Sequence, residues 1–410
     1  MLRHAKSAQF YDRVEIGVPP DDNSAADVLR IPHNMGAAAL PVASEMRIAR
    51  PTQPVTDRWK WRPVAPRGRT LLGISLRPYQ IAALGLDVPA TLTTLLAYPF
   101  QVLRLGAYWQ QCEPTPGAFC PDTLDWQIEA AEQAGKQIIL CVGAIKNFGY
   151  PEFFVPAHHR RDAFGEGTLI DPTTQSRLLE AASAFIRRVI ERYRDRPSIV
   201  AWQVEHEAID PLGMEHSWRL ATAFLEAEIQ AVRAADATRP IVLNGFLPTT
   251  LLAALFQWWR THDQGDSLDA AQRLADIVGV DYYPRYGLVS LAGRTLYMDG
   301  SRMPWQALRR TQLTTQTAQQ GRKLMITEGQ AEPWETVTTP PDPQGVGMYS
   351  CLPEHLIDTY NQWLTPDARG EQALYAYLFW GAEYWVRRQQ RGDPRYLQAF
   401  ARILEQAEMC

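Results

Sequence analysis

The chain has 410 residues, of which 46% are hydrophobic and 21% are charged, a composition that is ordinary for a folded globular protein. Lys and Arg number 41 against 45 Asp and Glu, so the formal net charge is −4. This balance excludes the broad basic surface of a nucleic-acid-binding protein. No run of 18 apolar residues is present, and we therefore expect no membrane span.

Residues 1–15 lack the apolar core of a signal peptide. The five cysteines are too few, and odd in number, for a disulfide framework. Both features favour a reducing compartment, so we expect a cytoplasmic protein. The sequence leaves its oligomeric state open.

The first 68 residues differ from the rest of the chain. They contain eight prolines and show no sustained hydrophobic periodicity, a pattern typical of extended or unstructured segments. We predict an extended or partly disordered N-terminal arm over 1–68 and a single catalytic domain over 69–410.

From about residue 70, short apolar runs alternate with amphipathic stretches. Continuous apolar runs indicate strands that are buried on both faces. The predicted strands are TLLGISL (70–76), VLRLGAY (102–108), QIILCVG (137–143), IVAWQVE (199–205), PIVLNGF (240–246), DIVGVDYY (276–283), KLMITE (323–328) and ALYAYLFW (373–380). The intervening stretches predict helices over 121–135, 172–195, 216–236, 303–321 and 352–364.

Eight strands separated by helices imply right-handed crossovers and a parallel sheet. This number of repeats closes a (β/α)8 barrel, or TIM barrel, and we predict that fold. A doubly wound open sheet is the alternative. It usually carries a glycine-rich phosphate-binding turn after its first strand, and GISLRPYQ (73–80) is no such turn.

Reactive residues of such a barrel lie at the carboxyl ends of its strands. The fourth predicted strand ends in WQVEHEA, which contains Glu205, His206 and Glu207, and the seventh leads into MITEGQAEPW, which contains Glu328. Cleavage of a glycosidic bond needs two such carboxyl groups, because one protonates the leaving oxygen while the other attacks the anomeric carbon or positions water. The sequence therefore predicts an enzyme that acts on an oligosaccharide or glycoside without a cofactor.

Five segments resemble, in this order, the large clan of retaining glycoside hydrolases built on the (β/α)8 barrel, which includes beta-galactosidase-like, cellulase-like and mannanase-like members. The segments are VLRLGAYWQQCEPTPGAF, AWQVEHEA, VGVDYYPRYG, LMITEGQAEPW and YLFWGAEYW. The resemblance spans residues 70–385. It implies that Glu207 is the acid/base and that Glu328 is the nucleophile.

The resemblance also implies residues that bind substrate or brace the nucleophile. Arg104 is expected to hold the nucleophile, Tyr283 to hydrogen-bond it, and Trp380 to form the floor under the sugar in the −1 subsite. His206 stands where the clan usually has an Asn that bonds the sugar 2-hydroxyl. A neutral imidazole donates the same bond, and some mannan-degrading relatives carry His-Glu there, so we expect His206 to bind a manno-configured or otherwise unusual glycan.

The implied mechanism is a double displacement with retention of configuration at a β-glycosidic bond. Glu328 attacks the anomeric carbon and Glu207 protonates the leaving oxygen. Water activated by Glu207 then releases the covalent glycosyl-enzyme. This mechanism predicts carboxyl groups about 5–5.5 Å apart and a raised pKa on Glu207.

Several alternatives stay open. Glu205 is a second candidate for the acid/base, since strand alternation can place it on the same face as Glu207. A catalytically inactive carbohydrate-binding barrel and a transglycosidase would both use the same barrel mouth. Insertions at about 144–171 and 329–352 favour exo action by closing one end of the site, while sugar and linkage stay open.

Two other enzyme classes are disfavoured. His206 and Glu207 begin an HExxH-like string, but Asp210 stands where the second histidine is needed. His158 and His159 show no metal-ligand spacing, so we predict no metal site. A G-x-S-x-G nucleophile elbow, which a serine hydrolase of the α/β class requires, is not present in the sequence.

Overall fold

The structure, a computed structural model, describes residues 46–160, 165, 167–210, 218–334, 345–364 and 374–408. Most of the predicted N-terminal arm, residues 1–45, lies outside the described residues, as do the first residues of the helix predicted over 216–236. The division of the chain at residue 68 stays a prediction.

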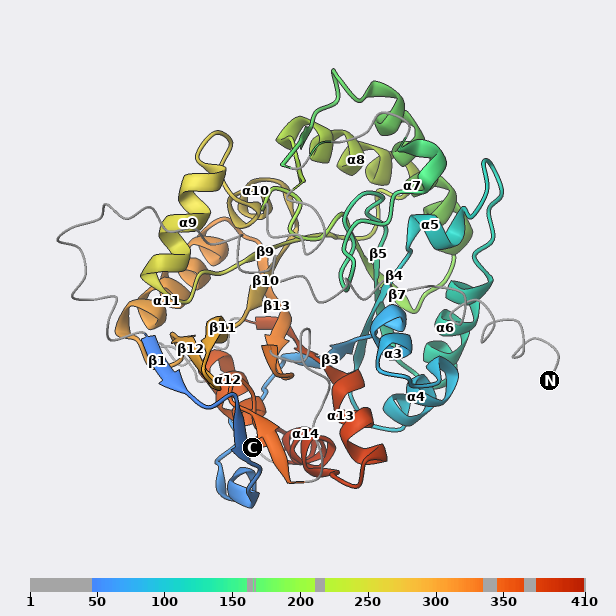
Figure 1. Ribbon diagram of the computed structural model, residues 1–410. Helices are drawn as coiled ribbons and strands as arrows, with labels where there is room; N and C mark the ends of the chain where they lie inside the picture. The colour runs from blue at the N-terminus through green and yellow to red at the C-terminus, as the bar shows by residue number, and fades with distance from the viewer. Residues whose placement is uncertain are drawn as a thin grey trace.

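Eight parallel strands form a closed barrel in chain order (Figure 1). Each corresponds to a predicted strand: β3 (Leu71–Ser75), β4 (Val102–Gly106), β5 (Gln137–Cys141), β7 (Ile199–Gln203), β9 (Ile241–Phe246), β10 (Ile277–Tyr282), β13 (Lys323–Gln330) and β15 (Leu374–Trp380). The predicted (β/α)8 fold is confirmed. The open sheet is excluded because β15 pairs with β3 and so closes the ring.

Helices surround the barrel on its outside (Figure 1). The helices that were predicted are α6 (Asp122–Gln133), α7 (Ser176–Tyr193), α8 (Thr222–Ala235), α11 (Pro304–Gln319) and α12 (Pro353–Leu364). The others are η2 (Asp57–Trp61), α3 (Pro78–Ala83), α4 (Val88–Leu96), α5 (Trp109–Cys112), η3 (Ala157–His159), α9 (Leu251–Thr261), α10 (Ser267–Leu274), α13 (Ala382–Gln390) and α14 (Arg395–Gln406). In α7, Leu178, Ala182 and Phe185 recur at helical spacing and are buried, which explains why this stretch forms a helix against the barrel.

Short strands outside the barrel were not predicted. A three-stranded antiparallel sheet joins β1 (Met46–Ala49) to β12 (Arg294–Asp299) and β11 (Arg285–Leu291). The described residues also form two strand pairs: β2 (Thr52–Pro54) with β14 (Val346–Met348), and β6 (Leu169–Ile170) with β8 (Arg219–Leu220). The described end of the predicted arm is therefore paired with segments that follow β10 and β13.

The barrel interior is a packed apolar layer, not a pore. Every strand contributes to it, through Leu71, Val102, Ile139, Ala201, Val242, Ile277, Met325, Ala376 and Leu378. Side chains alternate along a strand, so residues two positions further on point the same way. Arg104, Gln203 and Asn244 stand at those positions on three strands and form a buried polar layer above the apolar one.

Gly279 occupies the same level on β10. A Cβ atom there would lie 2.8 Å from Asn244 Cβ and 2.8 Å from Thr327 Cγ2, so only glycine leaves room for both side chains. No helix within the described ranges has both the length and the hydropathy to span a membrane.

Candidate active site

Glu328 lies in β13 with its carboxyl group between two donors. Arg104 Nη1, from β4, donates to Oε1 at 2.8 Å, and the hydroxyl of Tyr283, directly after β10, donates to Oε2 at 2.5 Å. Arg104 is completely buried and also donates through Nε to Gln203 at 2.8 Å. Buried charge-assisted bonds are strong and directional, so the Glu328 carboxylate is held in one orientation. The structure thus brings together three residues named from the sequence.

β13 departs from regular alternation at this point. Its pairing with β15 shifts register between Ile326 and Gly329. The hydroxyl of Thr327 donates to Asp281 Oδ1 at 2.7 Å, while the next residue, Glu328, bonds to Arg104. A register irregularity of this kind re-aims side chains at a strand end, which lets two consecutive residues contact the barrel mouth.

Glu207 follows the end of β7 and is 8% exposed. Its backbone φ of 43° lies in the left-handed region, which residues with a side chain rarely adopt. The buried Lys146 holds this turn, because its Nζ donates to the carbonyl oxygens of Glu207 at 2.7 Å and Asp210 at 3.1 Å. Burial, followed by the carboxyl groups of Asp281 and Asp210, raises the pKa of Glu207 well above its ordinary value.

Asn244 of β9 connects the two sides of the site. Its Nδ2 donates to Asp281 Oδ2 at 2.5 Å and to His206 Nδ1 at 2.9 Å. Its Oδ1 accepts from Gln203 Nε2 at 3.0 Å and from the backbone N–H of Glu207 at 3.3 Å. All four bonds agree with one orientation of the amide, which is therefore fixed by its partners.

The same network assigns the tautomer of His206. Since Nδ1 accepts from Asn244 and lies 3.4 Å from Arg104 Nη2, the ring proton sits on Nε2. Burial and the positive charges of Arg104 and Lys146 lower the pKa of His206 well below its ordinary value. His206 is therefore a neutral imidazole with one N–H to donate.

Glu205 serves a different purpose. Its φ of 57° is again left-handed, and its carboxylate accepts the backbone N–H groups of Ile145, at 2.9 Å, and Lys146. The carboxyl of Glu228 in α8 lies beside it, and burial together with the Glu205 charge raises the pKa of Glu228 well above its ordinary value. Glu205 thus fastens the β5–α7 connection to the end of β7.

Trp380 ends β15 and is 8% exposed. Phe148 meets its ring edge to face at 6.2 Å, and the guanidinium of Arg77 lies 4.2 Å from its ring centroid. Arg77 is itself held by Glu332 and Glu383, each at 2.8 Å, and all three side chains are buried. The indole is therefore fixed within a rigid set of contacts, as a stacking surface requires.

One group in this site has the composition of a metal centre. His206, Asp281 and Glu328 each offer a ligand atom, and these atoms lie within 4.8 Å of one another. The Arg104 guanidinium already supplies positive charge there, at 2.8 Å from Glu328 and 3.4 Å from His206. A metal ion so close to a guanidinium would meet strong repulsion, so the charge of Arg104 disfavours metal binding by this group.

The sequence analysis assigned no place in this network to Asn244 or Asp281, although each lies near the end of a predicted strand. Side-chain alternation along the strands could have placed both residues on the inner face of the barrel. Asn244 lies two positions beyond the interior residue Val242, and Asp281 lies two positions beyond Gly279. Lys146, in the connection after β5, was not assigned a role from the sequence, and in the structure it holds the turn that carries Glu207.

Comparison with known proteins gives partial sequence matches. A family model described as beta-galactosidase matches residues 97–226, a range that contains Arg104 and Glu207. Mannan endo-1,4-beta-mannosidase F from Aspergillus fumigatus is 30% identical over 109 residues, which are 25% of this chain and 23% of that protein. A probable mannan endo-1,4-beta-mannosidase F from Neosartorya fischeri is 31% identical over 86 residues, or 21% of this chain and 17% of that protein. The chain thus spans about a fifth of the length of the curated relatives it matches.

Solved structures share the fold over most of the chain. Xylanase 10B from Thermotoga maritima superposes with a TM-score of 0.52 at 14% identity, covering 84% of this chain and 99% of that one. A variant of GH5_18 from Streptomyces cattleya, in complex with Manb1-4GlcNAc, gives 0.52 at 15% identity, covering 82% and 80%. Motif order, family match and fold together confirm that this chain is similar to the glycoside hydrolases built on a (β/α)8 barrel.

Proposed function

We propose that the protein is a retaining β-glycosidase in which Glu328 is the nucleophile and Glu207 is the acid/base. The observation that carries this proposal is the contrast between their surroundings. Arg104 and Tyr283 donate to Glu328, whereas burial, followed by neighbouring carboxyl groups of which Asp281 is the first, raises the pKa of Glu207. Two carboxyl groups in opposite electrostatic environments are what a nucleophile and a general acid require.

In the first step, a Glu328 oxygen attacks the anomeric carbon while the protonated Glu207 gives its proton to the leaving oxygen. Arg104 and Tyr283 keep the attacking carboxylate in place, which removes the cost of orienting it during the reaction. The raised pKa of Glu207 favours the protonated form that a general acid needs.

In the second step, Glu207 has lost its proton and acts as the base. It takes a proton from the water that attacks the glycosyl-enzyme, and the second inversion restores the original configuration. This geometry needs the two carboxyl groups to be about 5–5.5 Å apart, which stays a prediction.

For the substrate, we propose a β-linked, manno-configured glycan. The Nε2–H of the neutral His206 supplies a donor next to the acid/base, and the fixed indole of Trp380 supplies a stacking surface for a sugar ring. Two matched relatives are named as mannan endo-1,4-beta-mannosidases, and one fold neighbour holds Manb1-4GlcNAc.

The test is hydrolysis of aryl β-glycosides with manno, gluco, galacto, xylo and fuco configuration, followed by short oligosaccharides. We expect cleavage by the wild type, loss of activity in Glu207→Ala and Glu328→Ala, and unchanged activity in Glu226→Ala, an exposed glutamate on α8. Azide should rescue both inactive variants, giving a glycosyl azide of inverted configuration with Glu328→Ala and of retained configuration with Glu207→Ala.

Three results would contradict the proposal. Activity that survives both substitutions would place the chemistry elsewhere. If the protein binds these sugars but cleaves none of the glycosides or oligosaccharides, it is a carbohydrate-binding barrel. Transfer to sugar acceptors in preference to water would indicate a transglycosidase that uses the same first step.

A further inference from the structure

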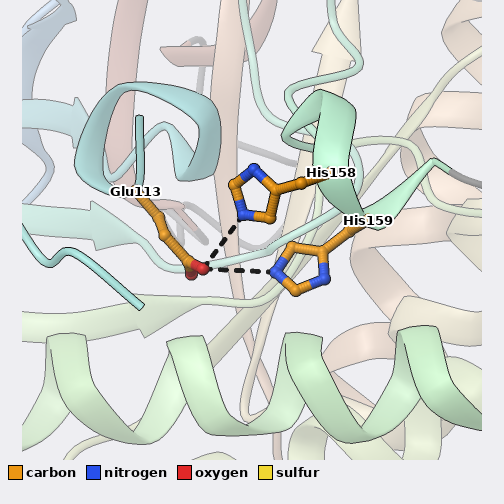
Figure 2. Close-up of side chains that lie close together, drawn as sticks. All are labelled: Glu113, His158 and His159. Atoms are coloured by element: carbon orange, nitrogen blue, oxygen red, sulfur yellow. Dashed lines mark hydrogen bonds and ion pairs between the residues drawn. The ribbon is translucent and has the colours of Figure 1, made fainter. Parts of the chain in front are cut away.

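A second group of ligand-type side chains consists of Glu113, His158 and His159 (Figure 2). Glu113 directly follows α5, and His158 and His159 are the last two residues of η3. The Nε2 atoms of His158 and His159 lie 3.1 and 3.3 Å from the same oxygen, Oε1 of Glu113. Figure 2 shows both rings pointing at that oxygen from the same short helix.

These separations fit a tetrahedral coordination shell. Zn–N bonds of about 2.0–2.1 Å and Zn–O bonds of about 2.0–2.2 Å place neighbouring ligand atoms of a tetrahedron about 3.3–3.5 Å apart. The two N–O separations are 3.1 and 3.3 Å, and all three ligand atoms lie within 4.8 Å of one another. Two histidines and one carboxylate are a ligand set that Zn²⁺ accepts, with water in the fourth position.

If the cluster is held by hydrogen bonds alone, Glu113 Oε1 has more donors than lone pairs. The backbone N–H of Gly117 also donates to it at 3.1 Å, so three donors converge on an oxygen that has two lone pairs. Both imidazoles would also need their proton on Nε2. A cation removes both requirements, because it takes one lone pair of the oxygen and the lone pairs of the two nitrogens.

The surrounding residues orient the three side chains. Trp109 Nε1 donates to the other oxygen of Glu113, Oε2, at 2.9 Å. The Trp109 indole stacks on His159 at 4.7 Å and on Phe185 of α7 at 5.5 Å. Partners of this kind, which fix ligand direction, are a regular part of protein metal sites. The side chains of Glu113, His158 and His159 are 12%, 16% and 26% exposed, so an ion can enter from solvent.

We propose that Glu113, His158 and His159 bind one divalent transition-metal ion, with Zn²⁺ the ion that this ligand set favours. The ion fastens the β4–α6 connection to the β5–α7 connection, which already share a backbone hydrogen bond from Gln110 to Phe154 at 2.8 Å. Its role is structural, and the proposal does not depend on the glycosidase activity.

The test is metal binding by the full-length protein. Metal content is measured on the protein as purified, and affinity is then measured by calorimetric titration with ZnCl₂ after chelation. We expect one Zn²⁺ per chain and an affinity at least about tenfold weaker in His159→Ala. Trp109→Phe keeps the ring packing but removes the donor to Glu113, so it should weaken binding about 10–100-fold. His262→Ala, which removes an exposed histidine elsewhere, should bind as the wild type does.

X-ray absorption of the zinc-loaded wild type identifies the ligands without any substitution. We expect nitrogen and oxygen ligands at about 2.0–2.2 Å, with the scattering pattern of imidazole. Sulfur at about 2.3 Å would place the ion on cysteine and overturn the proposal. Absence of Zn²⁺ uptake by the wild type would also overturn it, and so would unchanged affinity in a folded His159→Ala variant.

Discussion

Replacing Glu228 by Gln should change how the stability of the protein depends on pH. Glu228 is fully buried in α8 beside Glu205, whose carboxylate accepts backbone N–H groups. Burial and the Glu205 charge raise the pKa of Glu228 well above its ordinary value of 4.5, so the folded protein keeps a proton there that the unfolded chain releases. Glutamine has nearly the same shape but no proton to titrate.

The sign and size of the effect follow from proton linkage. Between the unfolded and folded pKa values the native state binds one more proton than the unfolded state, so the free energy of unfolding falls as pH rises. The slope is about 1.4 kcal/mol per pH unit for one proton. This stabilisation is fully present below the unfolded pKa and is lost as pH rises through the folded pKa of Glu228. The Glu228→Gln variant lacks this contribution. Between the unfolded and folded pKa values of Glu228, its free energy of unfolding relative to that of the wild type therefore rises by about 1.4 kcal/mol per pH unit.

The assay is urea unfolding of both proteins at a series of pH values between about 5 and 9. Only the difference in slope matters, so a constant loss of stability from the substitution does not affect the result. Glu226→Gln is the matched control, because Glu226 is exposed on the same helix, and it should run parallel to the wild type within about 0.5 kcal/mol. Parallel curves for Glu228→Gln and the wild type would show that Glu228 is ionised in the folded protein and would refute the reasoning.

Two further substitutions test the contacts around Glu328. Tyr283→Phe removes one hydrogen bond to a charged group, worth about 1.5–3 kcal/mol, so kcat/KM on the best glycoside should fall about 10–100-fold. Tyr282→Phe, at the neighbouring position, should not change kcat/KM by more than about tenfold, and equal losses in the two variants would contradict this assignment. Arg104→Met leaves a buried carboxylate unpaired and should lower the free energy of unfolding by about 3–5 kcal/mol in urea titrations. Lys60→Met breaks an exposed pair and should cost about 1 kcal/mol or less, so similar costs for both would show that Arg104 does not stabilise the fold through its charge.

The eight barrel strands were predictable because each is a local signal. A strand that is buried on both faces needs a continuous apolar run, and such runs stand out in the sequence whatever their partners are. The antiparallel additions were not predictable in the same way. β1 pairs with β12 across about 250 intervening residues, and four residues of ordinary composition carry no trace of that partner.

Part of the candidate site was also named in advance, through the resemblance to the barrel clan. Arg104, Tyr283 and Glu328 stand at or near strand ends, and the closed barrel forces those ends into one ring, so their contact follows from the fold once the strands are known. The catalytic roles of Glu207 and Glu328 stay predictions. The hydrogen bonds of Asn244 and the turning of Glu205 away to the backbone depend on exact side-chain directions, which alternation alone does not set.

The sequence by itself determined the barrel, the order of its strands and the strand ends that carry acidic residues, because these depend on local hydrophobic patterns. Only the tertiary structure decided which polar groups hydrogen-bond one another and which ligand-type side chains come together. Glu113 and the pair His158 and His159 are separated by about 45 residues, and no motif links them. They meet because two barrel connections fold against each other, and that contact is a property of the whole molecule.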